Sequence, residues 1–173
     1  MPEAGRGRLP AASVKRQIAS KQSWNVTRSA AQADFFTLGY SGRKIEEVLA
    51  SLKENRVRTL VDIRQNPISV HRPETSKNKL SQLLGSHHIN YAHHPEFGVP
   101  REIRAKASVA GSREVIWTWY DAHLAATCPD PRAFLKTFDT PAAFMCTELD
   151  PCECHRHRLA LAWEAAGLAS YDL

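Results

Sequence analysis

The chain has 173 residues, of which 43% are hydrophobic and 24% are charged, which is enough for one globular domain with a sizeable core. No apolar run approaches the ~18–20 residues that span a membrane, and no signal-peptide pattern occurs, so we expect a cytoplasmic protein without a membrane partner. The net charge of +5 arises within residues 1–33, which carry six basic residues and one acidic residue, whereas the remainder has 17 of each and is not basic.

Residues 1–33 are rich in Ala, Ser and Arg and lack sustained periodicity, which predicts a disordered basic tail. The rest predicts, in chain order, strand 34–40, helix 44–55, strand 57–64, helix 76–85, strand 89–94, a long loop from 95 to about 111, helices 112–127 and 129–138, strand 142–148, helix 152–167 and strand 168–173. Strands that alternate with helices predict an α/β class: a single three-layer domain over 34–173 with a mostly parallel sheet of about five strands.

Right-handed crossovers place every strand-to-helix loop at one edge of such a sheet, which is where open α/β sheets bind ligands. Polar side chains follow four of the predicted strands at this edge. They are Ser41, Gly42 and Arg43, then Asp62, Arg64 and Asn66, then His93, His94 and Glu96, and finally the stretch CTELDPCECHRHRL, residues 146–159. We therefore expect the functional site at this edge.

The last stretch contains the residues that begin a helix. Asp150 is a good N-cap, Pro151 suits the first helical position and Glu153 stands where the acid of a capping box stands. Much of the polarity of this stretch is thus explained by helix initiation. His155 falls on the same helical face as Leu159, so it is either a buried structural histidine or part of a site.

The four cysteines are Cys128, Cys146, Cys152 and Cys154, and three of them fall within nine positions, which fits reduced thiols better than a disulfide framework. Cys154 is predicted in the first helical turn, where the helix dipole and neighbouring arginines lower the pKa of a thiol. Cys146 ends a strand, where a small buried hydrophobe is the competing interpretation. The two thiols are candidates for nucleophilic chemistry.

Cys146, Cys154 and His155 also offer sulfur and imidazole ligands for a metal such as zinc. The usual spacing of two Cys pairs is absent, because Cys152-x-Cys154 is tight and no second pair exists. A metal site therefore remains an alternative, and we predict no cofactor.

Two regions favour binding of an anion. The loop from Gly39 to Arg43 lies between a strand and a helix, so its backbone can approach a ligand while Arg43 supplies a forked cation. Arg64 follows the neighbouring strand, where it either pairs with Asp62 or binds the ligand.

Four motifs occur in order: TLGYSGR (37–43), VDIRQNPIS (61–69), YAHHPEFG (91–98) and CTELDPCECHR (146–156). Together they resemble the domain of unknown function 488 family, over about four-fifths of the chain. The resemblance implies a shared site and names no reaction. Its motif positions are Ser41, Arg43, Asp62, Arg64, Pro67, Tyr91, Cys146, Glu148, Cys154, His155 and Arg156. Tyr40 departs from the family pattern, which has histidine there.

The leading hypothesis is an enzyme that acts on an anionic substrate, a nucleotide or nucleic-acid phosphate, through an activated thiol. The catalytic candidates are Cys154 as nucleophile, His155 as acid–base group and Glu148 as orienting group. The substrate-binding candidates are Ser41, Arg43, Asp62, Arg64, Tyr91, Cys146 and Arg156. The alternatives are a non-catalytic nucleic-acid-binding module that uses the basic tail, and the metal-dependent site.

Overall fold

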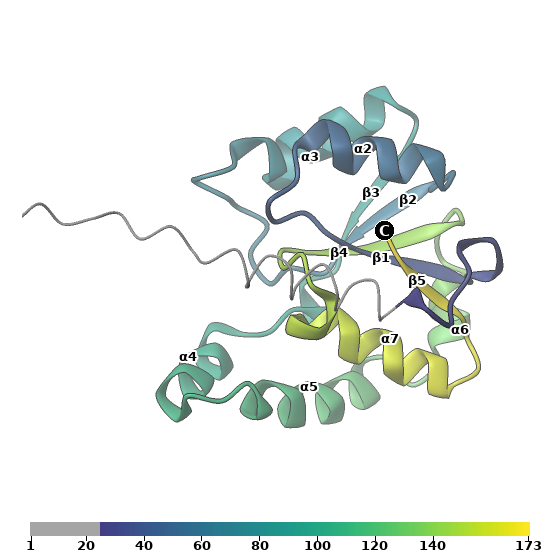
Figure 1. Cartoon of the computed structure of the whole chain (residues 1–173). Coiled ribbons are helices and arrows are strands. Elements are labelled where there is room, and N and C mark those ends of the chain that lie inside the picture. The colour runs from purple at the N-terminus through teal and green to yellow at the C-terminus, as the bar shows by residue number, and fades with distance from the viewer. Residues whose placement is uncertain (1–24) are drawn as a thin grey trace, which may run out of the picture.

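Five parallel strands form one sheet in the order β3-β2-β4-β1-β5 in the computed structural model, which describes residues 25–173 (Figure 1). The strands are β1 Phe35–Gly39, β2 Thr59–Asp62, β3 Asn90–His93, β4 Ala142–Cys146 and β5 Ser170–Asp172. The predicted α/β class and parallel five-stranded sheet are confirmed. In the register of the sheet, Gly39 lies beside Cys146 and Asp62 lies beside Met145, so the ends of the three central strands are neighbours.

Helices cover both faces of the sheet and complete the three layers (Figure 1). On one face lie α2 Ile45–Glu54 and α3 Lys77–Ser86. On the other lie α5 Glu114–Thr127, α6 Pro131–Leu135 and α7 His155–Ala165, with α4 Arg101–Ala110 packed beside α5. Short 3-10 turns are found at Ala30–Gln32, Pro73–Thr75, Pro95–Phe97 and Pro151–Glu153.

Side chains of β4 alternate between the two halves of the core, as the period of a strand requires. Ala143 and Met145 pack with the α2 and α3 layer, whereas Ala142, Phe144 and Cys146 pack with the layer that contains α7. The alternation decides which way the last residue of β4 faces. Cys146 therefore points toward the helix that carries the second thiol.

Two predicted elements need correction. The loop predicted from 95 to about 111 is wrong for residues 101–110, which form α4; this segment has good helix formers but few large apolar residues, and only Ala107 is buried. The predicted helix 152–167 begins later, at His155. The Asp150 carboxylate accepts a hydrogen bond from the Cys152 amide at 2.9 Å, but it starts the 3-10 turn, and Cys154 occupies the N-cap of α7.

Residues just before 34 contact the C-terminal part of the chain. Asn25 donates a hydrogen bond from Nδ2 to the carbonyl oxygen of Asp172 at 2.9 Å, and Arg28 forms an ion pair with Glu164 at 2.7 Å. These contacts place residues 25–33, part of the predicted tail, against the C-terminal segment. Residues 1–24 lie outside the part of the chain that the structure describes. Within the described part, no helix is both long enough and apolar enough to traverse a bilayer.

Candidate functional site

A pocket of about 160 Å³ opens at the carboxyl-terminal edge of the sheet. Its strand side includes Tyr40, Arg64 and Cys146, which lie at the ends of or just after β1, β2 and β4. Its helical side includes Arg104 from α4 and Trp117 from α5. Because parallel strands all end at this edge, the pocket brings together residues that are far apart in sequence.

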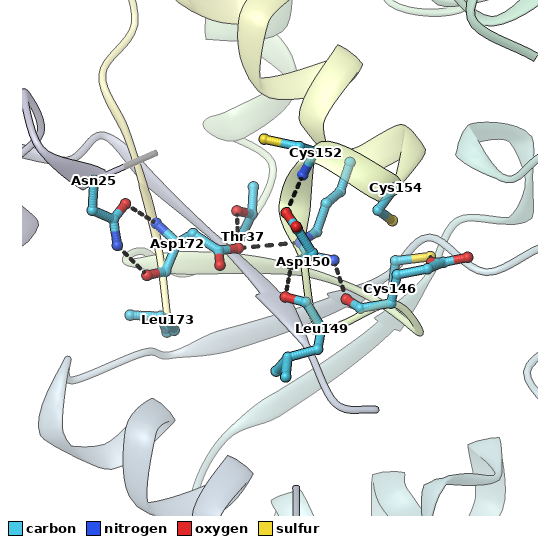
Figure 2. Close-up of polar contacts among 12 residues, drawn as sticks. Asn25, Thr37, Cys146, Leu149, Asp150, Cys152, Cys154, Asp172 and Leu173 are labelled. Carbon is cyan, nitrogen blue, oxygen red and sulfur yellow. Dashed lines mark hydrogen bonds and ion pairs between the residues drawn. The ribbon is translucent and has the colours of Figure 1, made fainter. Parts of the chain in front are cut away.

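Two thiols and an imidazole meet behind this pocket. The Cys146 sulfur lies 3.7 Å from Nδ1 and 3.8 Å from Nε2 of His155, and the Cys154 sulfur lies 3.9 Å from Nδ1. Figure 2 shows the Cys146 and Cys154 side chains converging from the end of β4 and the start of α7. Since the Cys146 sulfur is almost equally far from both ring nitrogens, it contacts the ring without a hydrogen bond directed at one of them.

Both sulfurs are buried, but only one of them lines the pocket. Cys146 is 4% exposed and lines the pocket together with His155, whereas Cys154 is 1% exposed and does not line it. Of the two thiols, Cys146 is therefore the one that a molecule in the pocket meets first.

The pKa values of the two thiols are shifted in opposite directions. A hydrogen bond to Cys154, together with burial, raises the pKa of Cys146 well above its ordinary value. Burial opposes ionisation of Cys154 as well, but the hydrogen bond from Cys146 and the positive charge of His155 hold the pKa of Cys154 well below its ordinary value. Burial lowers the pKa of His155, but the negative charge of Cys154 reverses this and raises it. Both pKa shifts favour a Cys154 thiolate beside a His155 imidazolium.

Glu148 places a carboxyl group next to the same sulfur. Its Oε2 lies 3.4 Å from the Cys146 sulfur, and the residue lines the pocket. Burial raises the pKa of Glu148, and the negative charge of Cys154 raises it further. A carboxyl group in this environment can hold a proton near the Cys146 sulfur.

The same cluster has the donor types that zinc prefers. One ligand atom from each of Cys146, Cys154 and His155 lies within 4.8 Å of the other two, and all three residues are buried. Two cysteine sulfurs and an imidazole are the ligand types of the Cys₂His sets of catalytic zinc. The residues therefore fit such an ion.

Arg64 pairs with Asp62, which is one of the two possibilities left by the sequence, and it also reaches the pocket. It is bidentate to Asp62, with Nε to Oδ1 at 2.8 Å and the second nitrogen to Oδ2 at 2.5 Å, and it also lines the pocket. Tyr91 donates its hydroxyl hydrogen to Asp62 Oδ2 at 2.6 Å, and Arg64 donates to the Tyr40 hydroxyl at 3.0 Å. Asp62 thus holds the Arg64 guanidinium group in position, and Tyr91 holds Asp62.

A family model described as "Domain of unknown function DUF488" matches residues 44–162. The chain belongs to the DUF488 family. The match spans more than half of the chain, confirms the resemblance seen in the motifs, and includes Arg64, Cys146, Cys154 and His155. No curated protein and no solved structure gives a match.

Arg156 has a structural role in this DUF488 domain. It is fully buried and donates to Asp172 Oδ1 from Nε at 3.1 Å, to the Leu149 carbonyl at 2.9 Å and to the Glu148 carbonyl. Figure 2 shows Asp172 receiving further hydrogen bonds, among them one from the Thr37 hydroxyl at 2.7 Å. These contacts fix the loop after β4 to β5, and Arg156 does not line the pocket.

Ser41 and Arg43 also lie away from the pocket of this DUF488 domain. The Ser41 side chain is exposed, and its amide donates to the Thr147 carbonyl at 2.9 Å. Arg43 donates to the Leu173 carbonyl at 3.1 Å and to the Ser51 hydroxyl. Ser41 and Arg43 therefore do not line the pocket that contains Cys146, although Tyr40 of the same loop does.

Sequence reasoning missed the helical side of the pocket. Arg104 is exposed, lines the pocket and makes no side-chain hydrogen bond or ion pair with the described residues. Arg113 forms an ion pair with Glu153 at 3.4 Å, and Trp117 follows it by four residues, on the same helical face. The helix-forming composition of 101–110 was the available signal, because a helix there would bring Arg104 against α5.

Proposed function

We propose that this DUF488 domain is a thiol-dependent enzyme that acts on a small anionic substrate, or on the anionic group of a larger one such as a nucleotide. The observation that carries the proposal is the position of Cys146 in the wall of a pocket whose helical side bears Arg104 and Arg113. A thiol and cationic side chains on facing elements supply a nucleophile and a means of holding a negatively charged substrate beside it.

Charge supports an anionic ligand. Arg64 is neutralised by Asp62 and Arg113 is paired with Glu153, whereas Arg104 has no side-chain partner among the described residues. The pocket volume of about 160 Å³ is close to the ~150 Å³ of a cavity that holds a benzene ring. A phosphate, a carboxylate or a single ring fits inside, and the rest of a nucleotide stays outside.

In this proposal Cys146 is the nucleophile and Cys154, which the sequence had placed first, has a supporting role, because Cys146 lines the pocket and Cys154 does not. Cys146 transfers its proton to the Cys154 thiolate, and its sulfur forms a bond with the electrophilic atom of the substrate. The leaving group departs with a proton from the His155 imidazolium. Glu148, 3.4 Å from the same sulfur, orients the thiol before the reaction.

Alkylation with reagents of different charge tests this function. Iodoacetate is anionic and iodoacetamide is neutral, and each forms the same kind of thioether with a thiol. We expect Cys146 to react faster with iodoacetate, relative to a free thiol such as glutathione, by about tenfold at low salt, because the Arg104 guanidinium, which no carboxylate of the described residues neutralises, attracts an anionic reagent to the pocket. Added inorganic phosphate should slow the reaction.

Cys152 provides the internal control, because it is exposed and lies outside the pocket. Peptide mapping by mass spectrometry assigns each rate to its cysteine. The proposal is wrong if Cys146 shows no more preference for iodoacetate than Cys152 does, or if phosphate leaves both rates unchanged.

A second candidate, a metal-dependent enzyme, is favoured by the convergence of Cys146, Cys154 and His155 within 4.8 Å. A zinc ion held by these three residues would act as a Lewis acid at a coordination position facing the pocket. The chain's own contribution is to bury the ligands and to hold Arg104 across the pocket.

Metal content separates the two candidates. Elemental analysis of protein purified without chelator should show about one zinc ion per chain for the metal site, and its loss in Cys154→Ser. Metal-bound thiolates also resist alkylation until a chelator is added. A chelator that leaves the Cys146 alkylation rate unchanged supports the free thiol instead.

The nucleic-acid-binding alternative rests on the basic residues of 1–33, of which only Arg28 lies in the described part of the chain. Arg28 pairs with Glu164. This alternative stays a prediction, and comparing nucleic-acid affinity at several salt concentrations with and without residues 1–24 tests it.

A further inference from the structure

The four cysteines occupy three kinds of environment. Cys128 is buried in the core, where it packs with apolar side chains of the α5 to α7 layer. Cys152 is exposed on the 3-10 turn, and Figure 2 shows its side chain pointing away from Cys154. Cys146 and Cys154 bring their sulfur atoms within 4.8 Å of one another. Among the described residues, this is the cysteine pair that the fold brings together.

We propose that a hydroperoxide entering the pocket converts Cys146 and Cys154 into an intramolecular disulfide, so that the cluster is a redox-modification site. This inference goes beyond the proposed function, because it requires neither the anionic substrate nor the arginines. It requires that an oxidant reach one sulfur, that the second sulfur be close enough to follow, and that the protein permit the small movement between them.

Access is provided by the pocket. Cys146 lines it, and a volume of about 160 Å³ admits hydrogen peroxide. Cys154 is 1% exposed and lies behind Cys146, so the oxidant meets the two sulfurs in that order. His155 also lines the pocket and can supply a proton to the departing oxygen.

The chemistry balances with the hydroperoxide as the only co-reactant. Cys146 passes its proton to Cys154 and its sulfur attacks one peroxide oxygen; the O–O bond breaks, a sulfenic acid forms, and the alkoxide takes a proton from His155 and leaves as an alcohol, or as water from hydrogen peroxide. The Cys154 sulfur then attacks the Cys146 sulfur; the S–O bond breaks, the S–S bond forms, and hydroxide takes the proton that Cys154 carried and leaves as water. The two sulfurs are oxidised and the peroxide is reduced.

Local structure permits the closure. The Cys154 side chain makes no capping hydrogen bond to the backbone of α7 that would hold its rotamer. The loop that joins the two cysteines is anchored at the carbonyls of Glu148 and Leu149 by Arg156. We therefore expect the sulfurs to come together by rotation of the two side chains while the loop keeps its position.

Treatment of the chelator-treated full chain with hydrogen peroxide, followed by intact-mass analysis and peptide mapping, tests the inference. We expect a loss of the mass of two hydrogen atoms, a Cys146–Cys154 crosslink, and full reversal by dithiothreitol. In Cys154→Ser, confirmed as folded by circular dichroism, Cys146 should instead stop at a sulfenic acid that dimedone traps. Cys152→Ser and Cys128→Ser should behave as the native chain does.

The inference is overturned if Cys154 is linked to Cys152, if Cys146 proceeds to sulfinic acid without a crosslink, or if the folded chain does not react. These outcomes are distinguishable from failure of the proposed function. A crosslink without iodoacetate preference at Cys146 leaves the redox site and removes the anionic substrate, and the converse result removes only the redox site.

Discussion

Arg156 and Asp172 form an ion pair of 3.1 Å between Nε and Oδ1, and both side chains are completely buried. The arginine comes from the first turn of α7 and the aspartate from β5, the strand at one edge of the sheet. Breaking such a pair leaves an uncompensated charge inside the protein.

We therefore predict that Arg156→Ala lowers the free energy of unfolding by about 3–5 kcal/mol, because the buried Asp172 carboxylate loses the positive charge of the guanidinium group. Arg158→Ala is the matched control on the same helix, since Arg158 pairs with Asp121 at the surface, where an ion pair contributes at most about 1 kcal/mol. Urea denaturation measures both. Equal losses in the two variants would contradict this assignment.

Gly39 must lack a side chain because the loop after β4 crosses it. A β-carbon at position 39 would come within 1.9 Å of the Glu148 carbonyl oxygen and 2.9 Å of an Arg156 guanidinium nitrogen. We predict that Gly39→Ala destabilises the domain by about 1–3 kcal/mol through this overlap. Gly85→Ala in α3 has nothing within 4 Å of the new carbon and should stabilise by about 0.5–1 kcal/mol. Denaturation curves of the two variants should shift in opposite directions.

Arg104 is the clearest test of the proposed attraction of anions to the pocket. We predict that Arg104→Ala lowers the iodoacetate-to-iodoacetamide rate ratio at Cys146 by about five-fold, since one charge near the surface contributes on the order of 1 kcal/mol. Arg101→Ala lies on the same helix but outside the pocket and should leave the ratio within error. A five-fold fall in both variants would point to net charge of the helix and not to the pocket.

The depressed pKa of Cys154 predicts a thiolate at neutral pH. Acidification of the chelator-treated chain should remove one thiolate ultraviolet band with a midpoint well below the ~8.5 of a free cysteine. Because the folded-state pKa is the lower one, the stability this thiolate contributes is complete above about 8.5 and is lost as the pH falls through the folded value. Cys154→Ser should abolish the band and Cys152→Ser should retain it; a band that persists in Cys154→Ser would assign the thiolate elsewhere.

The fold and the thiol cluster could be predicted because their signals are local. Apolar runs such as that in β2 indicate strands covered on both faces, and the parallel topology then brings the end of β4 and the start of the next helix to one edge. Cys146, Cys154 and His155 were found by that argument, and their convergence is confirmed.

The roles of the arginines could not be predicted, since a guanidinium group serves a ligand and a backbone carbonyl equally well. Arg43 and Arg156 direct their donors into the protein, at the carbonyls of Leu173, Glu148 and Leu149. These partners depend on tertiary placement that no spacing along the chain reveals. Arg104 escaped notice for the opposite reason, because α4 has too little apolar periodicity to be recognised as a helix.

The consecutive residues Cys154, His155 and Arg156 lie in three different environments. Cys154 is a buried thiol, His155 lines the pocket, and Arg156 forms a buried ion pair with Asp172. Conservation of this triplet in a relative would therefore combine two independent selective pressures, one on architecture and one on reactivity. Relatives that keep the arginine and the aspartate but lack both cysteines would have the same fold without the proposed thiol chemistry. Comparing family members position by position, and not by the whole motif, would separate the two groups.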